Sequence, residues 1–168
     1  EAIEAAYHAS FGGAVAINCM AVSNDAVMTS GRLLNPTNIV WRVSNDHAYP
    51  NVEETSAAVG WHVVLNGMNS ILLGEIFPKL DFDMFRASEW HAAVHATLRV
   101  ISGGPIYISD ATPFQKADKD KTVLLLSRLV TRFGIVPSCL YPGRATSDCI
   151  FADPRAGDPC LFKIWNRN

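Results

Sequence analysis

The sequence alternates between short apolar runs that favour β-strands and longer segments with the spacing of helices. The strand-like runs are AVAIN (14–18), NIVWRV (38–43), EIFPKLDFDMF (75–85) and PIYIS (105–109). The helical segments are 1–10, 52–74, 87–101 and 118–134. Because parallel strands need long crossovers, usually helices, this order predicts an α/β fold with a parallel sheet covered by helices.

Polar residues gather at the carboxyl end of each strand-like run. These ends read Asn18-Cys19, Ser44-Asn45-Asp46, Asp81-Phe82-Asp83-Met84 and Ser109-Asp110. In a (β/α)8 barrel the carboxyl ends of all strands meet on one face, and active sites are built there. The competing doubly wound sheet would usually show a glycine-rich phosphate loop after its first strand, and NCMAVSNDA (18–26) is not such a loop. The pattern therefore favours the barrel.

The length of the chain limits how much of a barrel it can form. A complete barrel usually takes about 250 residues. We therefore assign residues 1–136 to the C-terminal half of a (β/α)8 catalytic barrel, and we expect the chain, which opens inside a helical pattern without an initiator Met, to be a fragment. After Pro137 the helical period disappears, and a turn is expected at 153–159. Residues 137–168 are expected to be the first strands of a C-terminal antiparallel β domain.

Composition and charge exclude several classes of function. With 49% hydrophobic residues, 18% charged residues and a net charge of −2, the chain has the balance of a globular protein and no basic stripe for a nucleic acid. No apolar run reaches the ~18 residues of a membrane span. The cysteines lack the spacing of a zinc site and are too few for a disulfide scaffold, which favours a reducing compartment such as the cytoplasm but leaves the location open. The four cysteines are Cys19, Cys139, Cys149 and Cys160.

His91 and His95 have the i, i+4 spacing that can bind zinc on one face of a helix. The metalloprotease pattern needs Glu directly after the first His, however, and this chain has Ala92 there. We therefore expect these histidines to pack between a helix and the sheet. The sequence predicts neither a metal site nor a cofactor.

Three segments carry a resemblance to a known family. They are PKLDFDMF (78–85), EWHAAVHATLRVISGGPIYISD (89–110) and PGRATSDCIFADPRAGDPCLFKIWN (142–166). They resemble the raffinose synthase and seed-imbibition-type α-galactosidases of glycoside hydrolase family 36, which run Pro-Asp-Trp-Asp-Met-Phe, Ile-Ser-Gly-Gly-Pro-Ile-Tyr-Val-Ser-Asp and Pro-Gly-Arg-Pro-Thr-Arg-Asp-Cys-Leu-Phe. The resemblance implies part of a retaining enzyme acting on α-galactosides such as raffinose-type oligosaccharides, with the remainder of its barrel upstream.

The resemblance also implies roles for residues at the strand ends. Related enzymes carry Trp-Arg-x-x-x-Asp with the catalytic acid/base four residues after the Arg, a spacing that Arg42 and Asp46 match. Sugar-binding roles are implied for Arg42, Trp41, Asp83, Met84 and Cys19. Retaining glycosidases need two carboxyl groups, one that attacks the anomeric carbon and one that first donates and then accepts a proton. The family's nucleophile lies in a Lys-x-Asp stretch on an earlier strand, so residues 1–168 alone are expected to be inactive.

Two of these site residues have simpler interpretations that need no substrate. Asp46 could cap the loop before Pro50. Asp83 could form a surface ion pair with Lys79 or Arg86. The residues alone do not separate these interpretations from the catalytic ones.

The type of reaction is open as well. Plant members of the family have Ser-Asp-Asp where this chain has Ser44-Asn45-Asp46. The loss of one carboxylate keeps open a non-catalytic carbohydrate-binding relative, which a missing Lys-x-Asp upstream would support. Among enzymes, hydrolysis of α-galactosides is the leading expectation and galactosyl transfer is the alternative, since a sugar hydroxyl can replace water after the shared first step.

Overall fold

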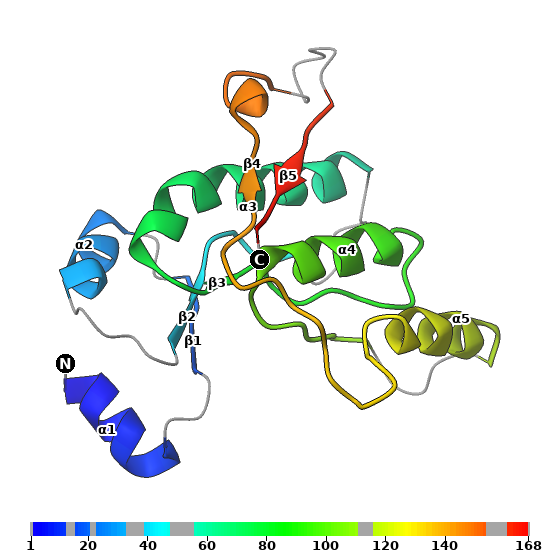
Figure 1. The fold of residues 1–168 in the computed structure, drawn as a ribbon, viewed down its shortest axis with the longest axis horizontal. Coiled ribbons are helices and arrows are strands. Elements are labelled where there is room, and N and C mark those ends of the chain that lie inside the picture. The colour runs from blue at the N-terminus through cyan, green and yellow to red at the C-terminus, as the bar shows by residue number, and fades with distance from the viewer. Residues whose placement is uncertain are drawn as a thin grey trace.

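A computed structural model describes residues 2–12, 16–20, 23–32, 39–47, 56–110, 116–153 and 161–167 (Figure 1). The helices are α1 (Ala2–Phe11), α2 (Asn24–Arg32), α3 (Ser56–Ile76), α4 (Ala92–Ser102) and α5 (Lys116–Ser127), with a short 3₁₀ helix at Ser147–Cys149. The strands are β1 (Ala16–Asn18), β2 (Ile39–Arg42), β3 (Leu80–Asp81), β4 (Arg144–Ala145) and β5 (Ile164–Trp165). They form two sheets, β1-β2-β3 and β4-β5.

The sheet β1-β2-β3 is parallel, as the alternation of strand-like and helical segments predicts. Arg42 lies opposite Asp81 in the register, so the carboxyl ends of β2 and β3 stand side by side. An isolated parallel bridge between Phe85 and Ile108 is what the structure shows of the strand predicted at 105–109. A sheet of three strands does not test whether a barrel closes, so the (β/α)8 architecture stays a prediction.

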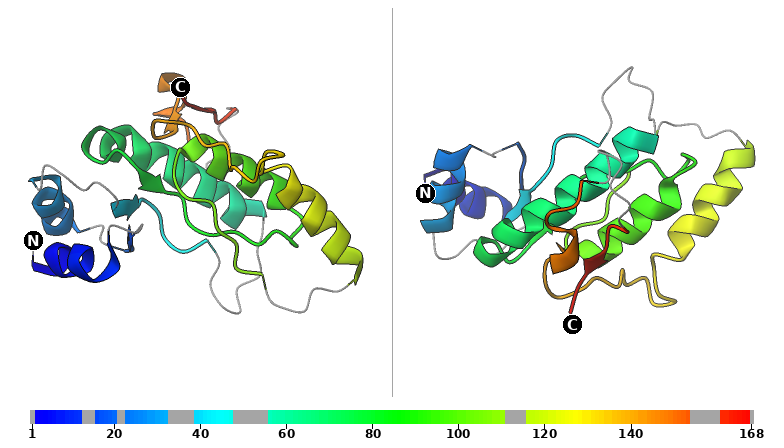
Figure 2. Two further views of the ribbon diagram at one scale, coloured as in Figure 1. Left: turned by 60° about the horizontal axis from the view of Figure 1, so that its bottom comes forward. Right: turned by 90° about the horizontal axis from the view of Figure 1, so that it is seen from above.

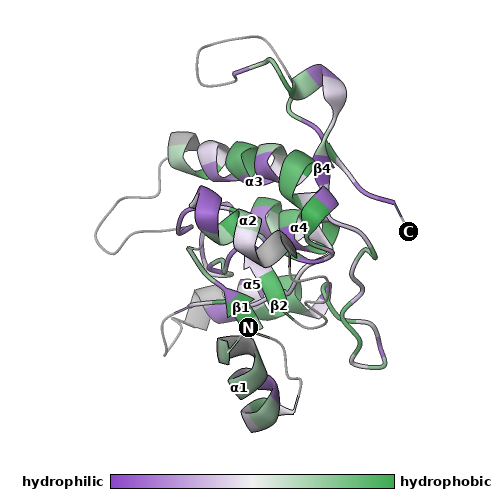
Figure 3. Cartoon of the chain, turned by 90° about the vertical axis from the view of Figure 1, so that its left-hand side faces the viewer, coloured by the Kyte–Doolittle hydropathy of each residue, from purple (hydrophilic) through white to green (hydrophobic). Residues whose placement is uncertain are grey.

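The helices α3, α4 and α5 run side by side with α4 in the middle (Figures 1 and 2), and Figure 3 shows hydrophobic residues along both α3 and α4. Trp41 of β2 and Phe82 after β3 pack with Phe77 and Leu98 in the main core cluster. The rings of Trp41 and Phe77 stack with centroids 4.3 Å apart. Burying each such side chain stabilises the fold by roughly 1.5–3 kcal/mol, which fixes β2 and β3 against α3 and α4. None of the described helices has the length and apolarity needed to cross a membrane.

The start of α4 differs from the prediction. The sequence predicts a helix over 87–101, but the helix begins at Ala92. The backbone N–H groups of Ala87 and Ser88 instead donate to the Asp110 carboxylate, at 2.8 Å each, and this holds the segment before α4 in a turn. The predicted end is confirmed, because Gly103 follows the helix with a left-handed φ of +75°.

The helices α5 and α2 differ more from the prediction. α5 ends at Ser127 rather than at Gly134. Gly134, with φ +78°, instead closes a separate turn in which its N–H donates to the carbonyl of Thr131. The helix α2 (Asn24–Arg32) was not predicted from the sequence.

The strands β4 and β5 pair antiparallel and lie beside α3 (Figure 1). Arg144 ties them to that helix through an ion pair with Glu75 and a 3.0 Å hydrogen bond to the carbonyl of Gly74. The turn predicted at 153–159 falls, except for its first residue, outside the described residues. The assignment of residues 137–168 to a separate domain stays a prediction.

The backbone of the loop after α4 approaches β3 so closely that Gly104 has no room for a side chain. A Cβ there would lie 1.9 Å from the carbonyl oxygen of Leu80, which is backbone and cannot rotate away. Gly104→Ala should therefore lower the free energy of unfolding by about 1–3 kcal/mol. Gly60 in α3 is the matched control, because nothing lies within 4 Å of its Cβ position. Gly60→Ala should raise the free energy of unfolding by about 0.5–1 kcal/mol.

Chemical denaturation of the full chain that the gene encodes measures both substitutions. The two substitutions are expected to change the free energy of unfolding in opposite directions. A Gly104→Ala protein as stable as Gly60→Ala would contradict the close approach of this loop to β3.

Candidate functional site

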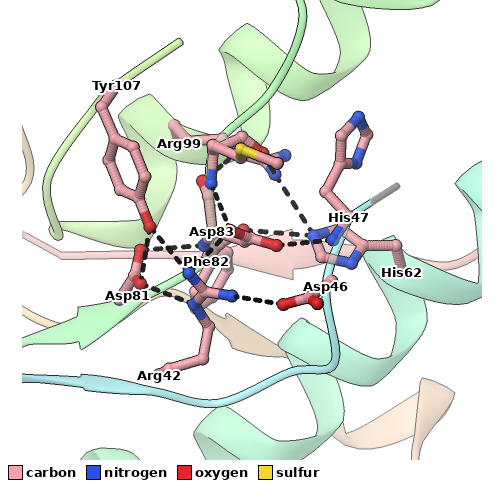
Figure 4. Close-up of polar contacts among 10 residues, drawn as sticks. Arg42, Asp46, His47, His62, Asp81, Phe82, Asp83, Arg99 and Tyr107 are labelled. Atoms are coloured by element: carbon pink, nitrogen blue, oxygen red, sulfur yellow. Dashed lines mark hydrogen bonds and ion pairs between the residues drawn. The ribbon is translucent and has the colours of Figure 1, made fainter. Parts of the chain in front are cut away.

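The register of the parallel sheet brings Arg42 of β2 beside Asp81 of β3. The Arg42 guanidinium lies between two carboxylates (Figure 4): its Nε donates to Oδ2 of Asp81 at 2.7 Å, and its Nη2 lies 2.7 Å from Oδ1 of Asp83. All three residues are buried. Since an uncompensated buried ion is strongly destabilising, each of these groups depends on the others.

Tyr107, from the segment after α4, completes this group. Arg42 Nη2 donates to the phenol oxygen at 2.9 Å, and the phenol donates to Oδ2 of Asp81 at 2.9 Å. Burial, together with the charge of Asp81 and the hydrogen bond to it, raises the pKa of Tyr107, so the phenol keeps its proton. Burial alone would lower the pKa of Arg42, but the hydrogen bond and charge of Asp81 and the charge of Asp83 raise it above its usual value. The guanidinium therefore stays charged.

Asp46 is the carboxylate near Arg42 that is open to solvent. Its side chain is 47% exposed, against 0% for Asp81 and 2% for Asp83. Arg42 Nη1 lies 3.5 Å from Oδ1 of Asp46, a longer contact than those to the buried carboxylates. Asn45 is exposed as well. Of these three carboxylates around Arg42, Asp46 is the one that solvent reaches.

Asp83 adopts a left-handed backbone conformation, with φ +72°, which costs a non-glycine residue roughly 1–2 kcal/mol. Its N–H donates to Oδ1 of Asp81 at 2.8 Å, and its carboxylate accepts the N–H of Met84 at 2.7 Å and the N–H of His47 at 2.5 Å. Burial raises the pKa of Asp83, against the charge of Arg42 and these N–H groups, which lower it. The Asp83 carboxylate thus connects the end of β3 to the loop that follows β2.

Arg99 of α4 is fully buried behind this turn. Its Nε donates to the carbonyl of Asp83 at 3.0 Å, and its Nη2 donates to the carbonyl of Met84 at 2.7 Å. Its Nη1 donates to Nδ1 of His95 at 2.6 Å. Burial lowers the pKa of Arg99 to about 10, although the charge of Asp83 opposes this, so the guanidinium is still charged at neutral pH.

Histidine rings pack together next to Arg99. The ring centroid of His47 lies 4.1 Å from that of His95 and 5.1 Å from that of His62, and both pairs are edge to face. Burial and the charge of Arg99 lower the pKa of His47 and His62 to about 3 and that of His95 to about 2. These three rings are therefore neutral at physiological pH.

The same histidines come close to the arrangement of a metal site. Ligand atoms of His47, His91 and His95 lie within 4.8 Å of one another. Arg99 can only donate, so its hydrogen bond to Nδ1 of His95 places the ring proton on Nε2. A metal ligand instead needs a deprotonated nitrogen facing the ion and donates its other N–H outward. The hydrogen bonding of His95 therefore argues against a cation here, and the absence of a metal and a cofactor stays a prediction.

The residues predicted to bind sugar lie in different surroundings. Trp41 is buried in the core against Phe77, and because side chains alternate along a strand, it points away from the Arg42 side of β2. Cys19 follows β1 and is exposed, and Met84 is partly buried. The nitrogens of Arg42 contact protein partners in this structure. Contact of these residues with a sugar stays a prediction.

The simpler interpretation of Asp83 is wrong. Asp83 is buried and pairs with Arg42, not with Lys79 or Arg86 at the surface. Arg86 instead lies 3.8 Å from Glu89. For Asp46, a capping role before Pro50 cannot be followed, because residue 50 lies outside the described ranges.

Comparison with known proteins identifies the family. Residues 1–168, the whole chain, match the model of the family described as raffinose synthase or seed imbibition protein Sip1. The chain belongs to this family. The resemblance carried by the sequence motifs is thereby confirmed.

Three relatives are 33–38% identical to this chain over the matched residues. The chain is 38% identical over 152 residues to probable galactinol–sucrose galactosyltransferase 6 of Arabidopsis thaliana, a match that covers 90% of this chain and 18% of the relative. It is 33% identical over 168 residues to probable galactinol–sucrose galactosyltransferase 1 of the same species, covering 100% and 20%. It is 36% identical over 109 residues to stachyose synthase of Pisum sativum, covering 65% and 12%. The chain thus spans about a fifth of the length of the first two relatives.

No sequence motif assigns a role to Tyr107 or Arg99. A signal for Arg99 exists: His91, His95 and Arg99 follow one another at intervals of four, which places them on one face of α4. A buried helix face that carries a cation must find polar partners for it. Tyr107 offers no such signal, since it sits inside the apolar run 105–109.

The neutral histidines make the fold sensitive to acid. An unfolded histidine titrates near pH 6.5, whereas His95 in the fold has a pKa of about 2. Below pH 6.5 the unfolded state therefore binds one proton more. By linkage this contribution to stability is fully present above pH 6.5 and is lost as the pH falls, by up to about 1.4 kcal/mol per pH unit.

The substitution His95→Gln should remove this contribution while its amide oxygen still accepts from Arg99. Between about pH 6 and pH 4, the free energy of unfolding of the variant should fall less steeply, by about 1.4 kcal/mol per pH unit. His8→Gln, at an exposed position of α1, is the matched control for the exchange of His for Gln. Urea unfolding at stepped pH measures this, and an unchanged slope in His95→Gln would mean that the folded ring already takes up the proton.

Proposed function

We propose that this protein supplies the acid/base and part of the sugar site of an enzyme that transfers galactosyl groups from an α-galactoside donor to a sugar hydroxyl, as in the raffinose series. The printed names of its relatives, galactinol–sucrose galactosyltransferases and stachyose synthase, support transfer. They favour the alternative that the sequence left open over the leading expectation of hydrolysis. A (β/α)8 barrel with its site at the carboxyl ends of the strands is part of the proposal.

The observation that carries the proposal is the exposed Asp46 beside a buried network of charges. A general acid must reach the oxygen of the bond it cleaves. Asp81 and Asp83 are closed off by Arg42 and by backbone N–H groups. In the described part of the strand ends of β2 and β3, Asp46 is the carboxylate that remains for this role, and it lies four residues after Arg42.

In a retaining transfer, Asp46 first donates its proton to the oxygen that leaves the anomeric carbon, while a nucleophilic carboxylate attacks that carbon. The galactosyl group is then held covalently. Asp46, now ionised, takes the proton from an incoming sugar hydroxyl, whose oxygen displaces the nucleophile. Two inversions at the anomeric carbon leave the α configuration unchanged. The nucleophile is expected on an earlier strand of the barrel.

The competition between a sugar hydroxyl and water tests the proposal directly. The full chain that the gene encodes is incubated with galactinol as donor, with and without sucrose, and the products are separated by chromatography. Sucrose should redirect the galactosyl group into a trisaccharide, because the hydroxyl replaces water in the second step. Free galactose alone, at every sucrose concentration, would make the protein a hydrolase. Binding of the donor by calorimetry without any turnover would make it a carbohydrate-binding relative.

The role of Asp46 predicts a dependence on the leaving group. Asp46→Ala should slow the first step about a hundred- to ten-thousandfold for natural galactosides, whose alcohol leaving groups need a proton. The same variant should nearly retain the first step with aryl galactosides whose phenols are acidic. The rate of phenol release in the burst phase, across phenols of graded pKa, measures the contrast.

Asn45→Ala is the matched control, since an exposed amide on the same loop cannot deliver a proton. Any loss of rate in Asn45→Ala should be the same for good and poor leaving groups. Equal losses for good and poor leaving groups in Asp46→Ala would assign Asp46 to sugar binding or to the fold, and would overturn its role as the acid.

A further inference from the structure

The turn at Asp83 is held on both sides of its backbone. On the amide side, the N–H of Asp83 donates to Asp81, and the N–H of Met84 donates to the Asp83 carboxylate. On the carbonyl side, the oxygens of Asp83 and Met84 both accept from Arg99, at 3.0 and 2.7 Å. Buried peptide groups need such partners. The left-handed conformation of Asp83 therefore depends on Arg99 to satisfy its carbonyl side.

The turn at Asp83 also fixes the loop that follows β2. Oδ2 of Asp83 accepts the N–H of His47 at 2.5 Å. That N–H belongs to the planar peptide group that joins Asp46 to His47, so its direction also sets the backbone of Asp46. A second route runs through side chains: Arg99 donates to His95, whose ring packs 4.1 Å from the ring of His47. Figure 4 shows Arg99, Asp83, His47 and Asp46 together at this site.

We infer that Arg99 is a positioning residue for the reaction, which holds Asp46 in its reactive place through Asp83 and His47. This deepens, and rests on, the proposed role of Asp46 as the acid/base. Arg99 is 0% exposed and directs its donors to backbone carbonyls and to the rings of His95 and His62, so it acts without touching the substrate. A displacement of about 1 Å in a catalytic group can cost about a hundredfold in rate.

The substitution Arg99→Lys separates the effect of hydrogen-bond geometry from the effect of charge. The planar guanidinium aims its donors in fixed directions, whereas the ammonium of lysine is a point charge on a flexible stem. Arg99→Lys therefore keeps a buried cation near Asp81 and Asp83 but loses the simultaneous bonds to the turn and to His95. Arg128→Lys, just after α5, makes the same exchange at an exposed position and serves as the matched control.

The first measurement needs no activity. Hydrogen exchange of the His47 amide in the full chain should become faster by about tenfold or more in Arg99→Lys, because the acceptor Asp83 is no longer held. The amide should exchange at an unchanged rate in Arg128→Lys. An unchanged rate in Arg99→Lys would overturn the inference, whether or not the protein turns over any sugar.

The second measurement is kinetic. With aryl galactosides, Arg99→Lys should lower kcat by roughly ten- to a hundredfold with little change in KM, and more strongly for poor leaving groups than for acidic phenols. In the Asp46→Ala background the same substitution should have a much smaller effect, because no proton donor is left to misplace. Additive losses, or equal losses for all leaving groups, would overturn the link to Asp46.

A negative result in the kinetic measurement does not decide the exchange measurement. If the unsubstituted chain neither transfers nor hydrolyses galactosides, the proposed function is wrong, while exchange at His47 still decides whether Arg99 holds the loop. If circular dichroism shows that Arg99→Lys does not fold, Arg99→Gln takes its place, since its single amide group can donate to no more than two of the acceptors that the guanidinium reaches. That variant should also speed the exchange of His47, and no change there would overturn the inference.

Discussion

The pairing of Arg42 with Asp81 and Asp83 is the interaction on which the rest of this strand end depends. Removing one partner of a buried ion pair typically destabilises by about 3–5 kcal/mol, because the other charge is left uncompensated. The two buried carboxylates take the short contacts of Arg42, at 2.7 Å each, and Asp46 is left with a contact of 3.5 Å. The buried carboxylates thus hold Arg42 most closely, while the side chain of Asp46 stays open to solvent.

The buried charged groups at this strand end are two cations and two anions. Arg42 on β2 and Arg99 on α4 face Asp81 and Asp83 at the end of β3, and the charges of these two carboxylates act on both guanidinium groups. Burial, and after it the charge of Arg99, keeps the pKa of the rings of His47, His62 and His95 low, so these rings are neutral. The hydrogen bond from Arg99 to Nδ1 of His95 suits a neutral imidazole better than a ligand of a metal ion.

The sequence predicts the order of the parallel sheet and the polar carboxyl ends of its strands, because both follow from local apolar patterns. It does not predict which polar groups meet. Arg42 and Asp81 are 39 residues apart, and only the register of β2 against β3 joins them. Trp41 shows the same limit, since the side to which its ring points, into the core, follows from the alternation of side chains along β2 and not from the family motif.

The division between buried and exposed residues also bears on Asn45, where this chain departs from the plant pattern. Asn45 is exposed, so an amide in place of a carboxylate there leaves the pairs of Arg42 and the hydrogen bonds of Asp83 intact. A group that first donates and then accepts a proton needs access to the substrate, while the groups that hold it need burial to stay in one geometry. Asp46 meets the first requirement and Arg42, Asp83 and Arg99 meet the second. The departure at Asn45 therefore falls outside the network that would position the acid.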